Sequence, residues 1–190
     1  MLQFLVNISF VLWGISEFLI ISRKRTPQNK NIKDRNSLIQ IVTLLITLPI
    51  GISFGNLANY PQLLRFPFDV SFWQTIGLIL LFTGLSIRWV SIHTLKKYFT
   101  ANLTIQEDHK LITTGIYKYI RHPSYLGGLF CFAGFGIALG NYISLFFIFF
   151  VNLIMVLVRI DFEEKILMNE FGSEFEEYKK RTKKLLPLLF

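Results

Sequence analysis

The chain has one cysteine and three histidines, and this scarcity excludes several kinds of site. One cysteine cannot form an intrachain disulfide or a multi-cysteine zinc site, and Cys131 lies in an apolar run where a packing residue is expected. His93, His109 and His122 form no H-x-x-x-H or H-E-x-x-H pair, so no metal site is predicted. The glycine motifs of serine hydrolases, P-loop proteins and Rossmann folds are also missing. A nucleotide-like cofactor would therefore need a pocket of another kind.

Charged residues are scarce as well, whereas apolar residues are abundant. Hydrophobic residues make up 52% of the 190 residues and charged residues 17%, which indicates a membrane protein rather than a soluble domain. The formal net charge is +8, from 20 basic and 12 acidic residues. In a membrane protein this excess is typical of cytoplasmic loops that face anionic lipid, so nucleic acid is not an expected partner.

Five apolar runs are candidates for membrane-spanning helices, because about 20 helical residues cross the hydrocarbon core. They cover residues 2–21, 38–57, 72–92, 125–139 and 142–158. Pro49 and Gly51 predict a kink in the second run. Only Gly140 and Asn141 separate the last two runs, which predicts a tight helical hairpin.

The linkers carry the basic residues and set the expected topology. Residues 23–35, 96–121 and 179–184 are rich in lysine and arginine, which places them in the cytoplasm and the N-terminus outside. Residues 161–181 interleave charged and apolar side chains, so we predict an amphipathic helix that lies against the membrane and is interrupted at Gly172.

The expected fold is all-α: a polytopic membrane helical bundle with about five transmembrane helices and a C-terminal interfacial amphipathic helix. We treat residues 1–190 as a single membrane domain. Its parts are the first three spans (1–95), a cytoplasmic connector that holds the cofactor site (96–124), a helical hairpin (125–160) and a cytoplasmic C-terminal segment (161–190).

Two charges within the apolar runs are assigned to the membrane boundary. Glu17 lies under two turns from Arg23, so an interfacial ion pair between them is expected. Arg88 lies near the end of the third run, where its long side chain can reach the headgroups. The fourth run and the residue that follows it carry several glycines, which predicts close packing against a neighbouring helix; they are Gly127, Gly128, Gly134, Gly136 and Gly140.

Polar and aromatic residues crowd into residues 109–125, HKLITTGIYKYIRHPSY. Thr113, Thr114 and Gly115 predict a turn, and Pro123 suits the first position of a helix because its missing N–H would have no partner there. The N–H groups of a helix start suit the carboxylate or ribose oxygens of a ligand. The alternative is a polar connector whose basic and aromatic residues rest at the headgroups.

A second cluster follows the fifth run. Arg159 and Glu163 are four residues apart and share one helix face, while Glu164 is turned by about 100°. Carboxylates can hold a ligand ammonium or sulfonium group with help from tyrosine faces, and an arginine can hold an anionic substrate group. The alternative is a set of helix-end ion pairs, Arg159 with Glu163 and Asp161 with Lys165.

At these residues the chain resembles the isoprenylcysteine carboxyl methyltransferase family, integral membrane enzymes that use S-adenosylmethionine. The resemblance covers residues 102–188 and is carried by HKLITTGIY, RHPSYLG, the R-x-x-x-E-E that begins at Arg159, and FGSEFEEYKKR followed by Pro187. The chain differs from the family at Asn102, where a longer glutamine can occur, and at Gly128, where eukaryotic relatives carry a tryptophan.

The resemblance implies an S-adenosylmethionine pocket reached from the cytoplasm. The implied cofactor-binding residues are Asn102, His109, Lys110, Leu111, Ile112, Tyr117, His122, Pro123, Ser124, Tyr125 and Glu163. Arg159 would bind the methyl acceptor, and Arg159, Glu163 and Arg121 are the catalytic candidates. Whether Arg121 and Glu164 contact ligand or brace the site stays open.

The expected function is transfer of a methyl group from S-adenosylmethionine to a lipophilic acceptor that enters from the bilayer. The family expectation is an isoprenylcysteine-type carboxylate, which Arg159 would position without a strong general base. An amine acceptor would require Glu163 or Glu164 to accept a proton. The alternatives are a phospholipid N-methyltransferase, an NADPH-dependent sterol-type reductase with a similar R-H-P-x-Y segment, and a non-catalytic membrane interaction protein.

Overall fold

The computed structural model describes residues 1–22, 35–56, 61–99 and 110–185, and most of them are helical. The helices are α1 (Leu2–Ser22), α2 (Arg35–Asn56), α3 (Val70–Leu95), α4 (Pro123–Ala138), α5 (Tyr142–Leu145), α6 (Val151–Phe171) and α7 (Ser173–Arg181). A π-helical turn, Phe146–Phe150, joins α5 to α6 without a break, and short 3₁₀ turns cover Gln62–Leu64, Lys96–Tyr98 and Gly115–Lys118. Strand-like pairing in the described residues is limited to two isolated bridges.

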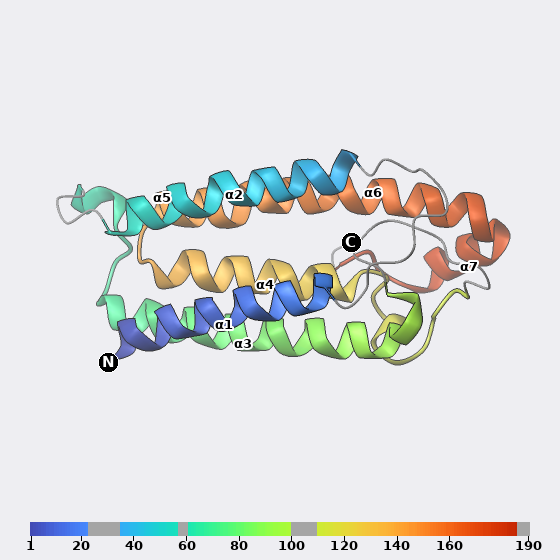
Figure 1. Cartoon of the computed structure of the whole chain (residues 1–190), viewed down its shortest axis with the longest axis horizontal. Helices are drawn as coiled ribbons and strands as arrows, with labels where there is room; N and C mark the ends of the chain where they lie inside the picture. The colour runs from blue at the N-terminus through green and yellow to red at the C-terminus, as the bar shows by residue number, and fades with distance from the viewer. Residues whose placement is uncertain (23–34, 57–60, 100–109, 186–190) are drawn as a thin grey trace.

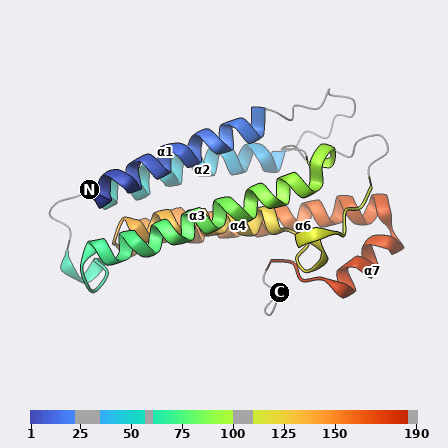
Figure 2. The ribbon, with the colours of Figure 1, turned by 90° about the horizontal axis from the view of Figure 1, so that it is seen from below.

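The long helices run up and down beside one another in a bundle (Figure 1). α3 packs along α4, α2 packs along α5 and α6, and α1 lies against α3 and α4. The last part of α6 extends past the end of α2, and α7 turns back from it (Figure 2). The start of α4, the C-terminal half of α6 and α7 therefore meet at one end of the molecule.

All five predicted spans form helices, and the all-α membrane fold is confirmed. Within the described residues, three helices are long and apolar enough to cross a bilayer, namely Leu2–Ile20, Val70–Leu95 and the continuous Tyr142–Phe171. Val42–Phe54 and Pro123–Ala138 are shorter apolar helices. Such a set of apolar helices is what an integral membrane protein requires, since each helix satisfies its own backbone hydrogen bonds.

Residues 161–181 are helical and interrupted at Gly172, as predicted, but no new helix begins at residue 161. α6 runs on to Phe171 as part of the fifth apolar helix, because no glycine or proline interrupts residues 151–171. The break comes at Gly172, whose φ of +50° is readily adopted by glycine. The amphipathic helix that remains is α7, with Phe175 and Tyr178 buried beneath a charged outer face.

Glycines set the spacing between α3 and α4. A Cβ atom on Gly127 would lie 2.6 Å from the carbonyl oxygen of Gly84, and one on Gly134 would lie 2.5 Å from that of Gly77. The two pairs are seven residues apart on each helix, so the antiparallel backbones touch at two successive levels. The predicted close packing of the fourth run is confirmed, and α3 is its partner.

α2 remains helical through Pro49, and polar side chains tie it to the long α5–α6 helix. Ser144 Oγ donates to the carbonyl oxygen of Gly51 at 2.6 Å, and Asn152 Nδ2 donates to Thr47 Oγ1 at 3.1 Å. Both bonds are buried, so they give two apolar helices a definite register where hydrophobic contact alone would not.

The two charges assigned to the membrane boundary pair with each other across the bundle instead. Glu17 Oε1 lies 2.5 Å from Arg88 Nε, and the predicted partner Arg23 lies outside the described residues. The prediction that Arg88 reaches out to the headgroups is wrong, because its guanidinium turns inward between α1 and α4. Helix packing brings together residues that are 71 positions apart, which sequence spacing alone does not indicate.

Candidate active site

The site is built at the start of α4. Gly115, with φ of +60°, turns the chain into the 3₁₀ segment Gly115–Lys118, which confirms the predicted turn. α4 then begins with Pro123 at its first position, as predicted, and His122 stands immediately before it. Pro123 is fully buried, so its contribution is to start the helix rather than to present a surface.

The C-terminal segment holds this connector in place through backbone pairing. Arg121 N–H donates to the carbonyl of Lys183 at 2.8 Å, and Lys183 N–H donates to the carbonyl of Tyr119 at 3.0 Å. In addition, the Tyr178 hydroxyl donates to the carbonyl of Tyr117 at 2.7 Å. Burial raises the pKa of Tyr178 to about 12, so this hydroxyl remains a donor at neutral pH.

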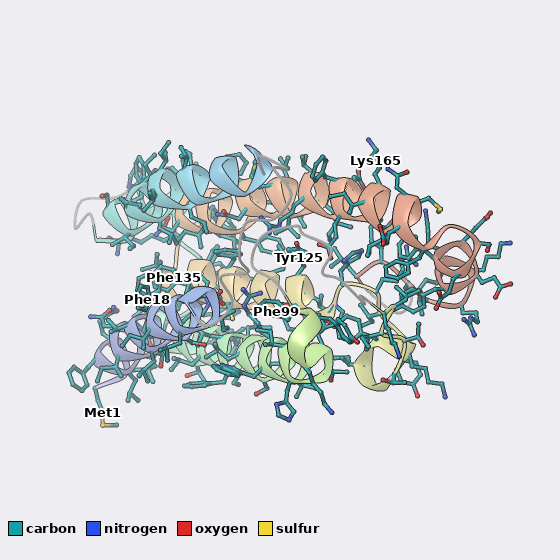
Figure 3. All side chains as sticks on the ribbon, turned by 45° about the vertical axis from the view of Figure 1, so that its right-hand side comes forward. Met1, Phe18, Phe99, Tyr125, Phe135 and Lys165 are labelled. Carbon is teal, nitrogen blue, oxygen red and sulfur yellow. The ribbon has the colours of Figure 1, made fainter. Side chains whose placement is uncertain are left out.

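Tyr125 links Arg159 and Glu163, the two residues of α6 that were predicted to share one face. Arg159 Nε donates to the Tyr125 hydroxyl at 2.7 Å, and that hydroxyl donates to Glu163 Oε2, also at 2.7 Å. The guanidinium also lies 5.9 Å from the centre of the Tyr125 ring. Figure 3 shows Tyr125 between the start of α4 and the flank of α6, with Lys165 on the outer side of that helix. The shared face predicted for Arg159 and Glu163 is therefore the face that meets α4.

Glu164 organises a separate group of charges. Its Oε1 accepts from Arg121 Nε at 2.9 Å and lies 3.1 Å from His122 Nε2, while Oε2 is 3.7 Å from Lys179 Nζ. Arg121 also donates to the carbonyl of Thr182 at 2.5 Å. The side chains of Arg121 and Glu164 are only 8% and 9% exposed. These contacts brace α6, the connector and α7 against one another.

We expect Glu164→Gln to lower the free energy of unfolding by about 3 kcal/mol, because it leaves the buried Arg121 guanidinium without its anion. Thermal or denaturant unfolding in detergent would measure the loss. The exposed Glu170 on the same helix provides the matched control, since Glu170→Gln should change stability by less than about 0.5 kcal/mol. Equal unfolding midpoints for the two variants would show that Glu164 does not brace the structure.

Glu163 differs from Glu164 in its surroundings. Its side chain is 27% exposed, and its Oε1 lies 4.0 Å from His122 Nδ1. A half-buried carboxylate beside the Tyr125 ring suits the ammonium or sulfonium of a ligand, whereas the buried Arg159 guanidinium suits a carboxylate. The residues present therefore fit both a cationic cofactor and an anionic acceptor.

The structure brings part of the predicted set together. The residues that meet between α4 and α6 are Arg121, His122, Tyr125, Arg159, Glu163 and Glu164. Ser124 and Tyr117 are buried, with Ser124 bonded to Arg88 and Tyr117 held by Tyr178. Lys110 is exposed, and Leu111 and Ile112 are half-buried. Asn102 and His109 lie outside the described residues.

Sequence reasoning did not assign three residues to this region, namely Thr182, Lys184 and Arg88. Lys184 pairs with Asp161 at 2.7 Å, and the carbonyl of Thr182 accepts a hydrogen bond from Arg121. Neither partner could be found from helix spacing, because both come from the segment after α7. Arg88, which donates to Ser124 at 3.0 Å, did give a signal, since a charge within an apolar run is a candidate functional residue.

Comparison with protein families identifies a match over the region that carries the site. Residues 76–169 match the model of the isoprenylcysteine carboxyl methyltransferase (ICMT) family. A rice protein described as a probable protein-S-isoprenylcysteine O-methyltransferase is 33% identical over 144 residues, which cover 74% of this chain and 75% of that protein. Protein-S-isoprenylcysteine O-methyltransferase B of Arabidopsis thaliana is 33% identical, over 80% of this chain and 81% of its own length.

A fungal relative and a solved structure extend the comparison. Protein-S-isoprenylcysteine O-methyltransferase of Schizosaccharomyces pombe is 34% identical, over 73% of this chain and 61% of that protein. The structure of the eukaryotic intramembrane Ras methyltransferase ICMT is similar in fold, with a TM-score of 0.65 and 23% identity. The match covers 95% of this chain but only 64% of that longer protein, so the likeness concerns the shared helical core.

Proposed function

The chain belongs to the isoprenylcysteine carboxyl methyltransferase family, and on this premise we propose that it moves the methyl group of S-adenosylmethionine to the carboxylate of a lipophilic, isoprenylcysteine-type acceptor. The chain is a membrane methyltransferase. The observation that supports the proposed cofactor and acceptor is the Tyr125 hydroxyl. It joins the Arg159 guanidinium to the Glu163 carboxylate, with a distance of 2.7 Å on each side.

The proposed division of work follows from charge and exposure. Bound S-adenosylmethionine supplies an electrophilic sulfonium methyl group. Glu163, half-exposed and beside the Tyr125 ring, would hold the positively charged part of the cofactor, while Arg159 would orient the acceptor carboxylate. The residues thus align an anion with an electrophile, which is the main requirement of such a transfer.

A carboxylate acceptor requires no proton transfer. Bound S-adenosylmethionine would supply the methyl group together with its own leaving group, the neutral thioether, so the ionised acceptor oxygen could take the methyl group directly. No general base is then needed, and neither Glu163 nor Glu164 has to accept a proton. An amine acceptor would have to lose a proton to a base. Glu164, the carboxylate next to Glu163 in the chain, is already engaged by Arg121 and His122.

We also propose that the cofactor reaches the site from the cytoplasm and the acceptor from the bilayer. The site lies at the end of the bundle where the basic residues of α7 and its following segment gather, as cytoplasmic ends of membrane proteins do. An acceptor with a hydrocarbon chain partitions into the membrane beside the apolar helices, so lateral entry would not remove that chain from lipid.

Calorimetric titration of S-adenosylmethionine and of its demethylated product into the detergent-purified protein tests the cofactor assignment. We expect both to bind the wild type and to bind Glu163→Gln about tenfold or more weakly, because the substitution removes a charge-assisted contact of roughly 1.5–3 kcal/mol. NADPH serves as the control for the sterol-type reductase alternative. A folded wild type that binds neither S-adenosylmethionine nor its product would contradict the proposal.

The acceptor is tested separately, by transfer of labelled methyl groups to a prenylated cysteine with a free carboxylate. The same compound with an amidated carboxyl group is the matched control, and phosphatidylethanolamine tests N-methylation. Label on the free acid alone supports the carboxylate assignment. Label on the phospholipid but not on the acid would replace it with N-methylation.

A further inference from the structure

Arg88 joins three helices at the edge of the proposed site. Its Nη2 donates to Glu17 Oε2 of α1 at 2.5 Å, and its Nη1 donates to both the carbonyl oxygen and the hydroxyl of Ser124, in α4, at 3.1 and 3.0 Å. The side chains of Arg88 and Glu17 are 16% and 24% exposed. One guanidinium therefore connects the N-terminal helix to the first turn of α4.

The position of this ion pair within apolar helices is costly. Arg88 lies seven residues before the end of α3 at Leu95, which corresponds to about 10 Å along the helix axis. Ionisable residues within a membrane-spanning helix are rare, face the interior of the bundle and usually serve a function. Packing alone could be supplied by apolar residues of the same size at lower cost.

The glycines of α4 make room for this arrangement. A Cβ atom on Gly127 would lie 2.8 Å from the backbone nitrogen of Arg88, so α4 approaches α3 closely at this level. On the adjacent Gly128, the nearest atom to an added Cβ would be Arg88 Nη1 at 3.9 Å. The guanidinium thus passes over the bare backbone of α4 and reaches Ser124 one turn earlier.

α1 is aligned with α3 by two further polar contacts. Gln74 Nε2 donates to Gln3 Oε1 at 2.6 Å, and Trp89 Nε1 donates to Ser16 Oγ at 3.0 Å. Together with the ion pair, these bonds give the parallel helices α1 and α3 a nearly constant offset of 71 to 73 residues. This register brings Glu17 directly to Arg88.

We infer that Arg88 is a positioning residue for methyl transfer and that Glu17 of the N-terminal helix orients it. Arg88 holds both the main chain and the hydroxyl of Ser124, and the next residue, Tyr125, carries the hydrogen bonds to Arg159 and Glu163. A shift of the first turn of α4 would displace Tyr125 from both partners. This inference rests on the proposed function, since Tyr125 matters here as part of the cofactor site.

The test compares Arg88→Met with the double variant Glu17→Gln/Arg88→Met. Arg88→Met leaves the partly buried Glu17 carboxylate without its cation, so stability and cofactor affinity should both fall. The double variant removes both charges and should restore most of the thermal stability. If Arg88 positions Ser124, the double variant still binds S-adenosylmethionine about tenfold more weakly despite its restored stability, and its KM for the cofactor rises equally.

Trp89→Phe is the matched control, because Trp89 contributes to the same contact between α1 and α3 but its bond goes to Ser16. It should lower stability slightly and leave cofactor affinity unchanged. A double variant with wild-type affinity would overturn the positioning role and leave Arg88 as a purely structural residue. A folded wild type that binds no S-adenosylmethionine would instead overturn the proposed function, and this inference with it.

Discussion

Arg159→Met is expected to lower kcat/KM for the methyl acceptor by about 10³-fold, because Arg159 is the buried cation proposed to orient the acceptor carboxylate. Binding of S-adenosylmethionine should weaken less than about tenfold, since Tyr125 can still donate to Glu163 when Arg159 is absent. Labelled-methyl transfer and calorimetry on the same preparation measure the two quantities.

Arg159→Lys is the informative companion variant. It keeps the positive charge but lacks the planar fork of arginine and the Nε–H that bonds Tyr125, so an intermediate loss is expected. Thermal unfolding of both variants controls for misfolding. Acceptor turnover within a few fold of the wild type in folded Arg159→Met would contradict the assigned role. Loss of cofactor binding as large as the loss of activity would place Arg159 in the cofactor pocket instead.

Gly127→Ala is expected to lower the free energy of unfolding by about 3 kcal/mol, a large share of the stability of a single domain. The added methyl carbon would lie 2.6 Å from the carbonyl oxygen of Gly84 and 2.8 Å from the nitrogen of Arg88, and neither backbone atom can move without separating α3 from α4. The expected readout is a lower unfolding midpoint in detergent, with activity lost in proportion to unfolded protein.

Gly128→Ala is a closely matched control, because it adds the same atom at the next residue of the same helix. Its nearest neighbour would be Arg88 Nη1 at an ordinary contact distance of 3.9 Å. Alanine also favours helix over glycine by about 1 kcal/mol, so this variant should be as stable as the wild type or slightly more stable. If both variants unfold alike, the close approach of the two helices does not limit stability.

The sequence indicated which residues belong to the candidate site better than it indicated which of them are in contact. The four-residue spacing of Arg159 and Glu163 correctly placed both on one face, because a helix with 3.6 residues per turn imposes that geometry locally. The predicted partner of Asp161 was Lys165, yet the structure pairs it with Lys184, which follows α7. Local spacing identifies residues that can contact each other within one helix. It does not identify a partner from a later segment that folds back against that helix.

Sequence alone determined the membrane class, the five apolar helices and the start of α4 at Pro123, because hydrophobicity, length and proline chemistry act over a few neighbouring residues. Only the tertiary structure decided that Glu17 pairs with Arg88 and that Tyr125 joins Arg159 to Glu163. Those pairings depend on which helices lie side by side and at what register. Both are set by the packing of the glycines of α3 and α4 and by polar contacts between helices.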